Sequence, residues 1–344
     1  MIQRKYDAID LTKFCMSILI VALHADALLD ISPWLNTFVC GGLARLGVPF
    51  FFVTSAYFLY SKPVSWESTR RYCKRLLTLY AAWFVVSIPK TIFDRFICSS
   101  YPFGETLFRF VRSFFVTSTF SGSWFIVSCI FCAVLFYYLD KLSQNRYRIV
   151  VIILSVLTYF WCVFSSAYGK LIDVIGLSLF YDGYVRFFAN PYTSFLVGIP
   201  YFALGKYFAT RSEKQMDGGV VCTFGGFISI ATLFVEVYLT SKYSMARTTD
   251  CYLMLLPCTF FLFPKILDWK IEIKNANWLR IASTIIFFSQ FLLLFSCEIF
   301  EWVFKITIPC LVKFFIAAIG GIILTQLILV YVEKPRWRWL KYFY

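Results

Sequence analysis

Long runs of hydrophobic residues, separated by short polar connections, extend along the whole chain. A helix needs about 20 mainly apolar residues to cross the hydrocarbon core of a bilayer. The runs lack the period-two alternation of barrel strands, so they predict helices. We predict about ten membrane-spanning helices, at residues 11–29, 38–60, 76–97, 122–139, 149–167, 192–209, 219–240, 250–267, 279–297 and 309–331. The fold class predicted is therefore all-α, a polytopic transmembrane helix bundle.

Two connections differ from the short loops between these spans. Residues 105–118 place Arg109 and Arg112 on one side of a helix and phenylalanines on the other, which is typical of an amphipathic helix in the membrane interface. Residues 168–190 form a longer connection of mixed character. No polar stretch is long enough for a separate soluble domain, so we predict a single membrane domain over residues 1–344.

The composition agrees with a membrane protein. Of the 344 residues, 60% are hydrophobic and 15% are charged, and the mean hydropathy is +0.72. A soluble domain carries about a quarter charged residues. The net charge of +14 is typical of basic cytoplasmic loops that contact anionic headgroups, so we expect a phospholipid bilayer and no nucleic acid as partner. With one histidine, and 12 cysteines mostly inside apolar runs, we expect no metal site.

The loops predict an orientation. With the N-terminus inside, the inner loops hold 21 Lys and Arg residues and the outer loops hold 9. An excess of Lys and Arg marks the cytoplasmic side of a membrane protein. We therefore predict that both termini, and the basic loop 62–75, lie in the cytoplasm.

Ionisable residues inside a bilayer are costly and mark functional sites by default. The first predicted span contains Lys13, His24 and Asp26. Lys13 and His24 lie on one helix face, about three turns and roughly 16 Å apart in height. His24 is either a general base or substrate ligand, or a neutral imidazole bonded to a neighbouring helix. Asp26 points elsewhere unless the helix ends before it.

The second predicted span contributes four further residues of interest, Arg45, Pro49, Ser55 and Tyr57. Arg45 either binds an anionic group or extends to the outer interface. Pro49 is expected to distort the helix and free a carbonyl group. The hydroxyls of Ser55 and Tyr57 either contact substrate or pack between helices.

Other candidate residues lie further along the chain. Glu236, at the outer end of the seventh span, either joins the site or is solvated at the interface. Gln290 lies in the middle of the ninth span. Arg70, Arg71 and Arg75 either fix the topology of an inner loop or bind the phosphates of a cytosolic donor such as coenzyme A.

Several motifs resemble the membrane-bound acyltransferase-3 family. The segment DAIDLTKFCMSILIVALHA at 7–25 is similar to the opening helix of that family, which has an Asp, a Leu-Arg pair and a His about three turns on. The segment RLGVPFFFVTSAYFLY at 45–60 is similar to its second helix. Weaker similarities at 70–83, 123–131 and 198–208 extend the resemblance over most of the chain.

The resemblance implies transfer of an acyl group, often acetyl, from cytosolic acyl-CoA to a hydroxyl at the cell envelope. The implied acceptor is a cell-surface polysaccharide or a lipid-linked glycan. The implied location is the inner (cytoplasmic) membrane of a bacterium. We expect acyl-CoA, most simply acetyl-CoA, as co-substrate and no tightly bound cofactor, and we consider a homodimer as one assembly.

By this resemblance His24 corresponds to the essential histidine, and we assign His24 and Asp26 as the candidate catalytic residues. We expect the outer loops 90–121 and 168–191 to select the acceptor. The candidate substrate-binding residues are Lys13, Arg45, Ser55, Tyr57, Trp124, Glu236 and Gln290. The candidate residues for the donor phosphates are Arg70, Arg71 and Arg75.

Three positions depart from the family pattern. Lys13 stands where the family usually has Arg, which keeps the charge and loses the bidentate geometry. Ala56 replaces a glycine, so that close helix approach is less free. Gln290 stands where the family often has a second His, and an amide cannot titrate. His24 must then do the acid–base work alone or with a carboxylate.

A second resemblance lies within the family. Residues 234–239 and 250–269 are similar to the membrane domain of vancomycin-resistance serine racemases, which is tied to serine uptake and precedes a soluble racemase. Because the sequence ends at Tyr344, we expect no racemase half. Three hypotheses stay open: an O-acyltransferase, a transporter of a small polar solute such as an amino acid, and a member with only a structural or partner role. The enzyme hypothesis predicts a passage from the basic inner face to His24.

Overall fold

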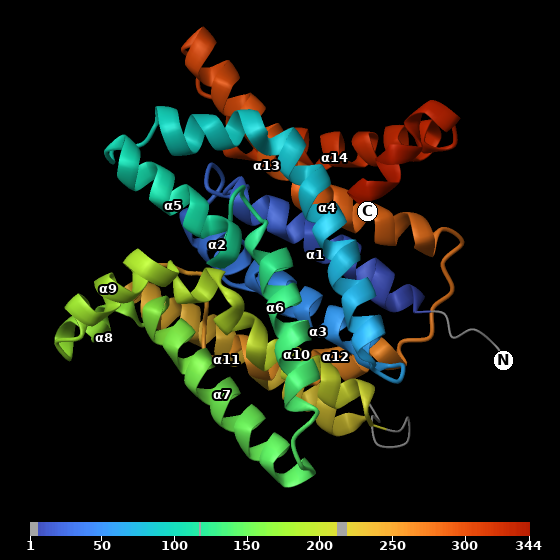
Figure 1. The fold of residues 1–344 in the computed structure, drawn as a ribbon. Helices are drawn as coiled ribbons and strands as arrows, with labels where there is room; N and C mark the ends of the chain where they lie inside the picture. Colours follow the sequence, from blue (N-terminus) through green and yellow to red (C-terminus); the bar gives the residue numbers. More distant parts are fainter. Residues whose placement is uncertain (1–5, 117, 212–218) are drawn as a thin grey trace.

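A computed structural model describes residues 6–116, 118–211 and 219–344, and helices form the framework of these residues (Figure 1). The α-helices are α1 (Asp7–His24), α2 (Pro33–Val39), α3 (Gly47–Tyr60), α4 (Trp66–Ile92), α5 (Phe103–Val116), α6 (Trp124–Leu139), α7 (Gln144–Ser165), α8 (Gly169–Val174), α9 (Ser178–Phe188), α10 (Phe195–Ala209), α11 (Val220–Lys242), α12 (Leu255–Asp268), α13 (Ala276–Phe304) and α14 (Cys310–Val332). The short helical turns are η1 (Leu43–Leu46), η2 (Phe93–Ile97), η3 (Pro191–Thr193) and η5 (Pro335–Phe343). No strand occurs in these ranges.

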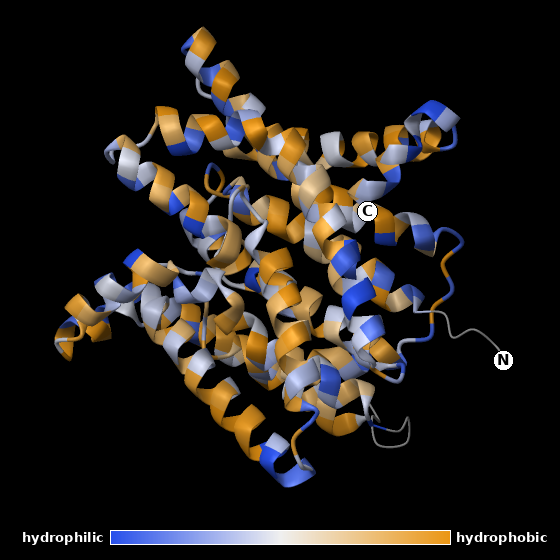
Figure 2. Ribbon diagram, in the orientation of Figure 1, coloured by the Kyte–Doolittle hydropathy of each residue, from blue (hydrophilic) through white to orange (hydrophobic). Residues whose placement is uncertain are grey.

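The predicted class, an all-α polytopic bundle, is confirmed, since every predicted span coincides with a helix. Within the described residues, six helical segments are long and apolar enough to cross a membrane. The other predicted spans coincide with α1, α6, α10 and α12, which have 18, 16, 15 and 14 residues. Figure 2 shows long hydrophobic stretches on the outer helices, as on α7, whose hydrophilic residues gather at one end.

The cytoplasmic location of the two termini stays a prediction. Among the basic residues that support it, Arg4, Lys5 and Lys214 lie outside the described residues.

The second predicted span is not one continuous helix, because α2 ends before Gly41 and Gly42, and α3 begins at Gly47 after the turn η1. Glycine loses more backbone conformational freedom than any other residue when it enters a helix, so two consecutive glycines favour a break in the helix. The prediction that Pro49 distorts a helix is wrong, because α3 begins only two residues before it. Pro49 lies in the first turn of α3, where a missing N–H costs no helical hydrogen bond.

The helices α1 and α3, drawn in blue, lie in the middle of the bundle, between α4, α6, α10, α12 and α13 (Figure 1). Gly205 of α10 allows the closest approach of this core, since a Cβ there would lie 2.4 Å from the carbonyl oxygen of Val53 and 2.7 Å from Cβ of Ala56. The glycine missing at Ala56 is thus replaced by a glycine on the facing helix, so α3 and α10 still pack closely.

The two ends of the bundle differ in charge. The backbone N–H of Ile273 donates to Asp7 at 2.8 Å, so α13 and α1 begin side by side. We call this the basic end, because it also carries Arg70, Arg71 and Arg75 at the start of α4. The opposite end, where α1 ends and α3 begins, is called the cavity end.

Candidate functional site

A cavity of about 490 Å³ lies at the cavity end. Its walls come from the last turns of α1 and α4, from the middle and later turns of α13, and from the first turns of α3, α6 and α10. The turns η1 and η3 and the segment that leads into α12 complete it. Of the predicted site residues, the cavity brings together His24, Arg45 and Trp124. Glu298 of α13 lines the cavity with an exposed side chain, so the cavity opens to the surface at this end.

His24 is the last residue of α1, and its side chain is accessible from the cavity. Its ring packs edge-on against Phe291 of α13, with 4.8 Å between centroids. Within the described parts of the chain the imidazole makes no hydrogen bond to protein. A neutral imidazole has one donor and one acceptor nitrogen, so both can serve a bound molecule. This arrangement does not have the helix-bonded imidazole that the alternative interpretation required.

Arg45 forms a salt bridge with Asp250 inside the same cavity, and its guanidinium also donates to the hydroxyl of Thr249 at 3.0 Å. The side chains of Arg45 and Asp250 keep 18% and 29% of their exposure, so the pair faces open space. Asp250 was not a predicted site residue. Its only signal in the sequence is a carboxylate placed at the start of a hydrophobic run.

Glu236 holds the segment that carries Asp250. Its buried carboxylate accepts the backbone N–H groups of Leu253 (2.6 Å) and Met254 (2.9 Å) and the hydroxyl of Tyr168 (3.0 Å). The first N–H groups of a helix lack partners within it, so the carboxylate satisfies the start of α12. Glu236 thus lies behind the cavity wall rather than at the solvated interface.

Two other side chains fasten the same segment. The hydroxyl of Ser166 accepts the N–H of Cys251 at 2.9 Å, and the hydroxyl of Tyr159 accepts the N–H of Leu256 at 3.0 Å. The connection into α12 is therefore fixed by three buried groups, from α7, α11 and the turn after α7.

Asp26 lies just beyond the end of α1, at a positive φ of 48°. Its carboxylate accepts a hydrogen bond from the amide of Asn36 at 3.0 Å, and the same amide's oxygen accepts the N–H of Leu28 at 3.2 Å. Asp26 does not line the cavity with His24. The contacts make it a residue of the turn between α1 and α2.

Three predicted substrate contacts lie within the helix packing rather than in the cavity wall. Tyr57 is buried, and its ring packs against that of Phe263 at 5.5 Å. Ser55 lies beside Tyr72. Gln290 is fully buried and donates from its amide to the carbonyl of Phe287 at 2.8 Å.

The remaining cationic candidates lie toward the basic end. Lys13 has Asp10 and Arg75 as charged neighbours. Arg70 and Arg71 are exposed on the first turns of α4, where Arg71 lies 3.8 Å from Glu67. None of these residues lines the cavity.

A cluster of three aromatic rings borders the cavity at Phe287. The rings of Phe51, Phe125 and Phe287 contact one another, with centroids 5.7 to 6.2 Å apart. Phe287 is the deepest α13 residue in the cavity lining, and Phe51 lies half a turn below Pro49 of α3. The cluster therefore lies on the side of His24 that faces the basic end, where the enzyme hypothesis predicts a passage.

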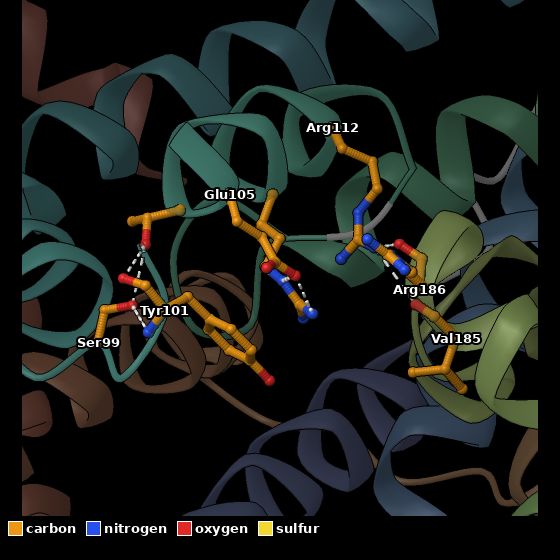
Figure 3. Close-up of polar contacts among 8 residues, drawn as sticks. Ser99, Tyr101, Glu105, Arg112, Val185 and Arg186 are labelled. Atoms are coloured by element: carbon orange, nitrogen blue, oxygen red, sulfur yellow. Dashed lines mark hydrogen bonds and ion pairs between the residues drawn. The ribbon is translucent and has the colours of Figure 1, made fainter. Parts of the chain in front are cut away.

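Of the two outer connections that were predicted to choose the acceptor, 90–121 lines the cavity and 168–191 ends beside it. Arg112 of α5 donates to the backbone carbonyls of Val185 (3.2 Å) and Arg186 in α9, as Figure 3 shows. Ser121 from the first connection and Tyr192, next to the second, line the cavity. The predicted amphipathic segment is α5, and it lies against α9.

The acyltransferase domain family matches residues 6–333, which is nearly the whole chain. The chain belongs to this family.

Curated relatives include two proteins of Enterococcus faecalis named amino-acid racemase. One is 24% identical over 77% of this chain and 36% of its own length, and the other is 21% identical over 97% and 47%. A serine/alanine racemase of Enterococcus gallinarum is 23% identical over 77% of this chain and 38% of its own. The chain spans between about a third and a half of these relatives. No solved structure matches it.

Proposed function

We propose that the protein is an O-acyltransferase, most simply an O-acetyltransferase, with His24 as its general base. It takes the acyl group from cytosolic acyl-CoA and places it on a hydroxyl of a cell-surface polysaccharide or lipid-linked glycan, at a bacterial cytoplasmic membrane. The observation that carries the proposal is an imidazole without a protein hydrogen bond, facing a cavity shared with a cation.

In the proposed reaction His24 accepts the proton of the acceptor hydroxyl while its oxygen attacks the thioester carbonyl carbon. The carbon–oxygen bond forms, the carbon–sulfur bond breaks, and the coenzyme A thiolate leaves. The thiolate takes the proton from the imidazolium, which restores the neutral base. Arg45 supplies positive charge in the same cavity for the oxyanion of the tetrahedral intermediate.

The donor approaches from the basic end in this proposal, with its phosphates on Arg70, Arg71 and Arg75. The aromatic cluster of Phe51, Phe125 and Phe287 lies on this route. The proposal therefore includes a conformational step, of the kind that gates many enzymes, in which these rings move apart when the thioester enters.

The test follows transfer of a labelled acetyl group from acetyl-CoA to a purified glycan acceptor, with the chain in nanodiscs. His24→Ala should lower the rate at least 100-fold, because general-base catalysis contributes about 10²–10⁴. Asp26→Asn, a matched change at the same helix end, should leave the rate within a few-fold. Transfer by a folded His24→Ala protein at the wild-type rate would refute the mechanism.

A second candidate is transport of a small polar solute such as an amino acid. It is favoured by the cavity itself, which opens at one end and holds a pair of opposite charges. The relatives' names, amino-acid racemase and serine/alanine racemase, agree with an amino acid as solute.

The two candidates differ in their need for acyl-CoA. A transporter moves labelled serine into proteoliposomes without acyl-CoA. An acyltransferase binds acyl-CoA, and a ligand at 100 times its Kd adds about 2.7 kcal/mol of stability. Thermal stabilisation by acetyl-CoA without serine flux supports the enzyme, and serine flux without stabilisation supports the transporter.

A further inference from the structure

A second, smaller pocket of about 130 Å³ adjoins the His24 cavity. Lys90, Ser118, Ser121 and Phe291 line both, so the two spaces meet at these side chains. Phe291 is also the ring against which His24 packs. A molecule in the larger cavity can therefore extend a substituent past Phe291 into the smaller one.

The smaller pocket is polar, and its own lining holds more cations than carboxylates. Its ionisable lining residues are Lys90, Asp94 and Arg95, two cations and one carboxylate. The ammonium of Lys90 lies 3.1 Å from Asp94 and 3.9 Å from Glu298, so its charge is balanced. Arg95 donates to the carbonyl oxygen of Ser118 at 2.8 Å, a neutral acceptor. Asp94 also acts on the charge of Arg95, but within the described residues Arg95 forms no salt bridge, so it is the lining cation left without an ion-pair partner.

Hydroxyl groups supply the rest of the polar wall. They come from two buried positions on the last turns of α4, Ser87 and Thr91, and from the segment before α6. That segment is fixed, since Thr119 shares a hydrogen bond with Tyr80 and Ser123 donates to the carbonyl of Phe120 at 2.8 Å. Hydroxyls beside a guanidinium form a good set of donors for a group with several oxygens.

The volume limits what the smaller pocket can hold. The smaller pocket, at about 130 Å³, has room for a carboxylate or a phosphate group. The cavity of about 490 Å³ beside it has room for the sugar ring that carries such a group. Charge, donors and volume agree on a small anionic group.

We propose that this pocket binds a carboxylate or phosphate substituent of the acceptor, with Arg95 as the residue that selects its charge. The inference rests on the proposed function, because it places the acceptor's reacting hydroxyl at His24. It names the acceptor class as an acidic glycan, and it assigns a binding role to Arg95 and to the hydroxyls around it.

Binding to the full chain in nanodiscs, without acyl-CoA, tests this class. The probes are methyl β-D-glucuronide, glucose 6-phosphate and methyl β-D-glucoside, which carry a carboxylate, a phosphate and no charge. At least one anionic probe should bind ten-fold or more tightly than the neutral one, and the tighter anion identifies the source of the charge. Equal binding of all three probes would overturn the proposal.

Three variants test whether Arg95 is the residue that causes the preference for an anionic probe. Arg95→Gln keeps a donor for the carbonyl of Ser118 and should reduce the preference for the anionic probe to less than two-fold. Arg95→Lys should restore most of it. Arg186→Gln removes an exposed cation of α9 outside both pockets and should change nothing. A preference that survives Arg95→Gln would also overturn the proposal.

Probe binding tests the anion pocket, and acyl transfer tests the proposed reaction, so the two proposals can fail separately. His24→Ala should abolish acyl transfer and keep the preference for the anionic probe. Acyl transfer to a neutral acceptor, with no preference in binding, would refute the pocket and leave the acyltransferase intact. A charge preference without any acyl transfer would keep the pocket and refute the reaction.

Discussion

Arg45 and Asp250, 205 residues apart in the chain, form a salt bridge. It joins the turn before α3 to the segment that leads into α12. Both side chains line the cavity that holds His24. Removing one member leaves the other charge without its partner in a partly desolvated place. The pair therefore contributes to the cavity's shape as well as its charge.

The first prediction concerns this pair. Arg45→Gln and Asp250→Asn should each cost about 1–3 kcal/mol of stability, less than the 3–5 kcal/mol of a fully buried pair, because both side chains are partly exposed. The double variant should cost less than the sum of the two. Thermal unfolding of the wild type, the two single variants and the double variant in nanodiscs gives the stabilities for a double-mutant cycle. Strictly additive losses would show that the two charges are not coupled.

The second prediction concerns Glu236. Glu236→Gln leaves one acceptor oxygen where the carboxylate offers two, so the start of α12 should lose a charge-assisted hydrogen bond of about 1.5–3 kcal/mol. Hydrogen exchange of residues 250–256 should rise. Tyr168→Phe, which removes one neutral donor from the same carboxylate, should raise it less. Unchanged hydrogen exchange in Glu236→Gln would show that the Glu236 carboxylate does not order this segment.

The third prediction concerns the contact of α3 with α10. Gly205→Ala places a methyl group 2.4 Å from the carbonyl oxygen of Val53, so the helices must separate, at a cost of about 1–3 kcal/mol. Gly226→Ala in α11 meets only Leu262 at 3.6 Å and should change stability by less than about 1 kcal/mol. Equal effects of the two variants on the melting temperature would contradict the close approach.

The fourth prediction concerns acid. In the connection after α7, hydrogen bonds from Ser178 (2.6 Å) and then Arg247 hold the pKa of Asp173 below its ordinary value. A lowered folded pKa stabilises the protein above the ordinary value, near pH 4, and this contribution disappears as the pH falls through the folded pKa. The melting-temperature difference between wild type and Asp173→Asn should therefore stay constant from about pH 8 to 5 and shrink below about pH 4.

Periodicity and hydrophobic length were sufficient for the helices. Runs such as 149–167 and 309–331 are apolar over a full membrane thickness, and α7 and α14 coincide with them. The break before α3 was missed because hydropathy does not distinguish Gly41 and Gly42 from their apolar neighbours. Backbone freedom, rather than hydrophobicity, decided that boundary.

The site was only partly accessible from sequence. His24 and Arg45 were predicted from the cost of charge inside a bilayer, and they share the cavity. Asp250 and Arg95 were missed because both lie at the ends of predicted spans, where charges are ordinary. These ends of spans come together only in the tertiary structure. A single sequence does not indicate which distant segments contact one another.

The three-ring cluster of Phe51, Phe125 and Phe287 has a consequence for the membrane itself. A water-filled cavity shortens the apolar barrier between the two sides of a bilayer, and charge crosses a shorter barrier more easily. Bulky rings packed beside such a cavity keep the rest of the barrier apolar. We expect that replacing them with small side chains raises the proton permeability of liposomes that contain the protein.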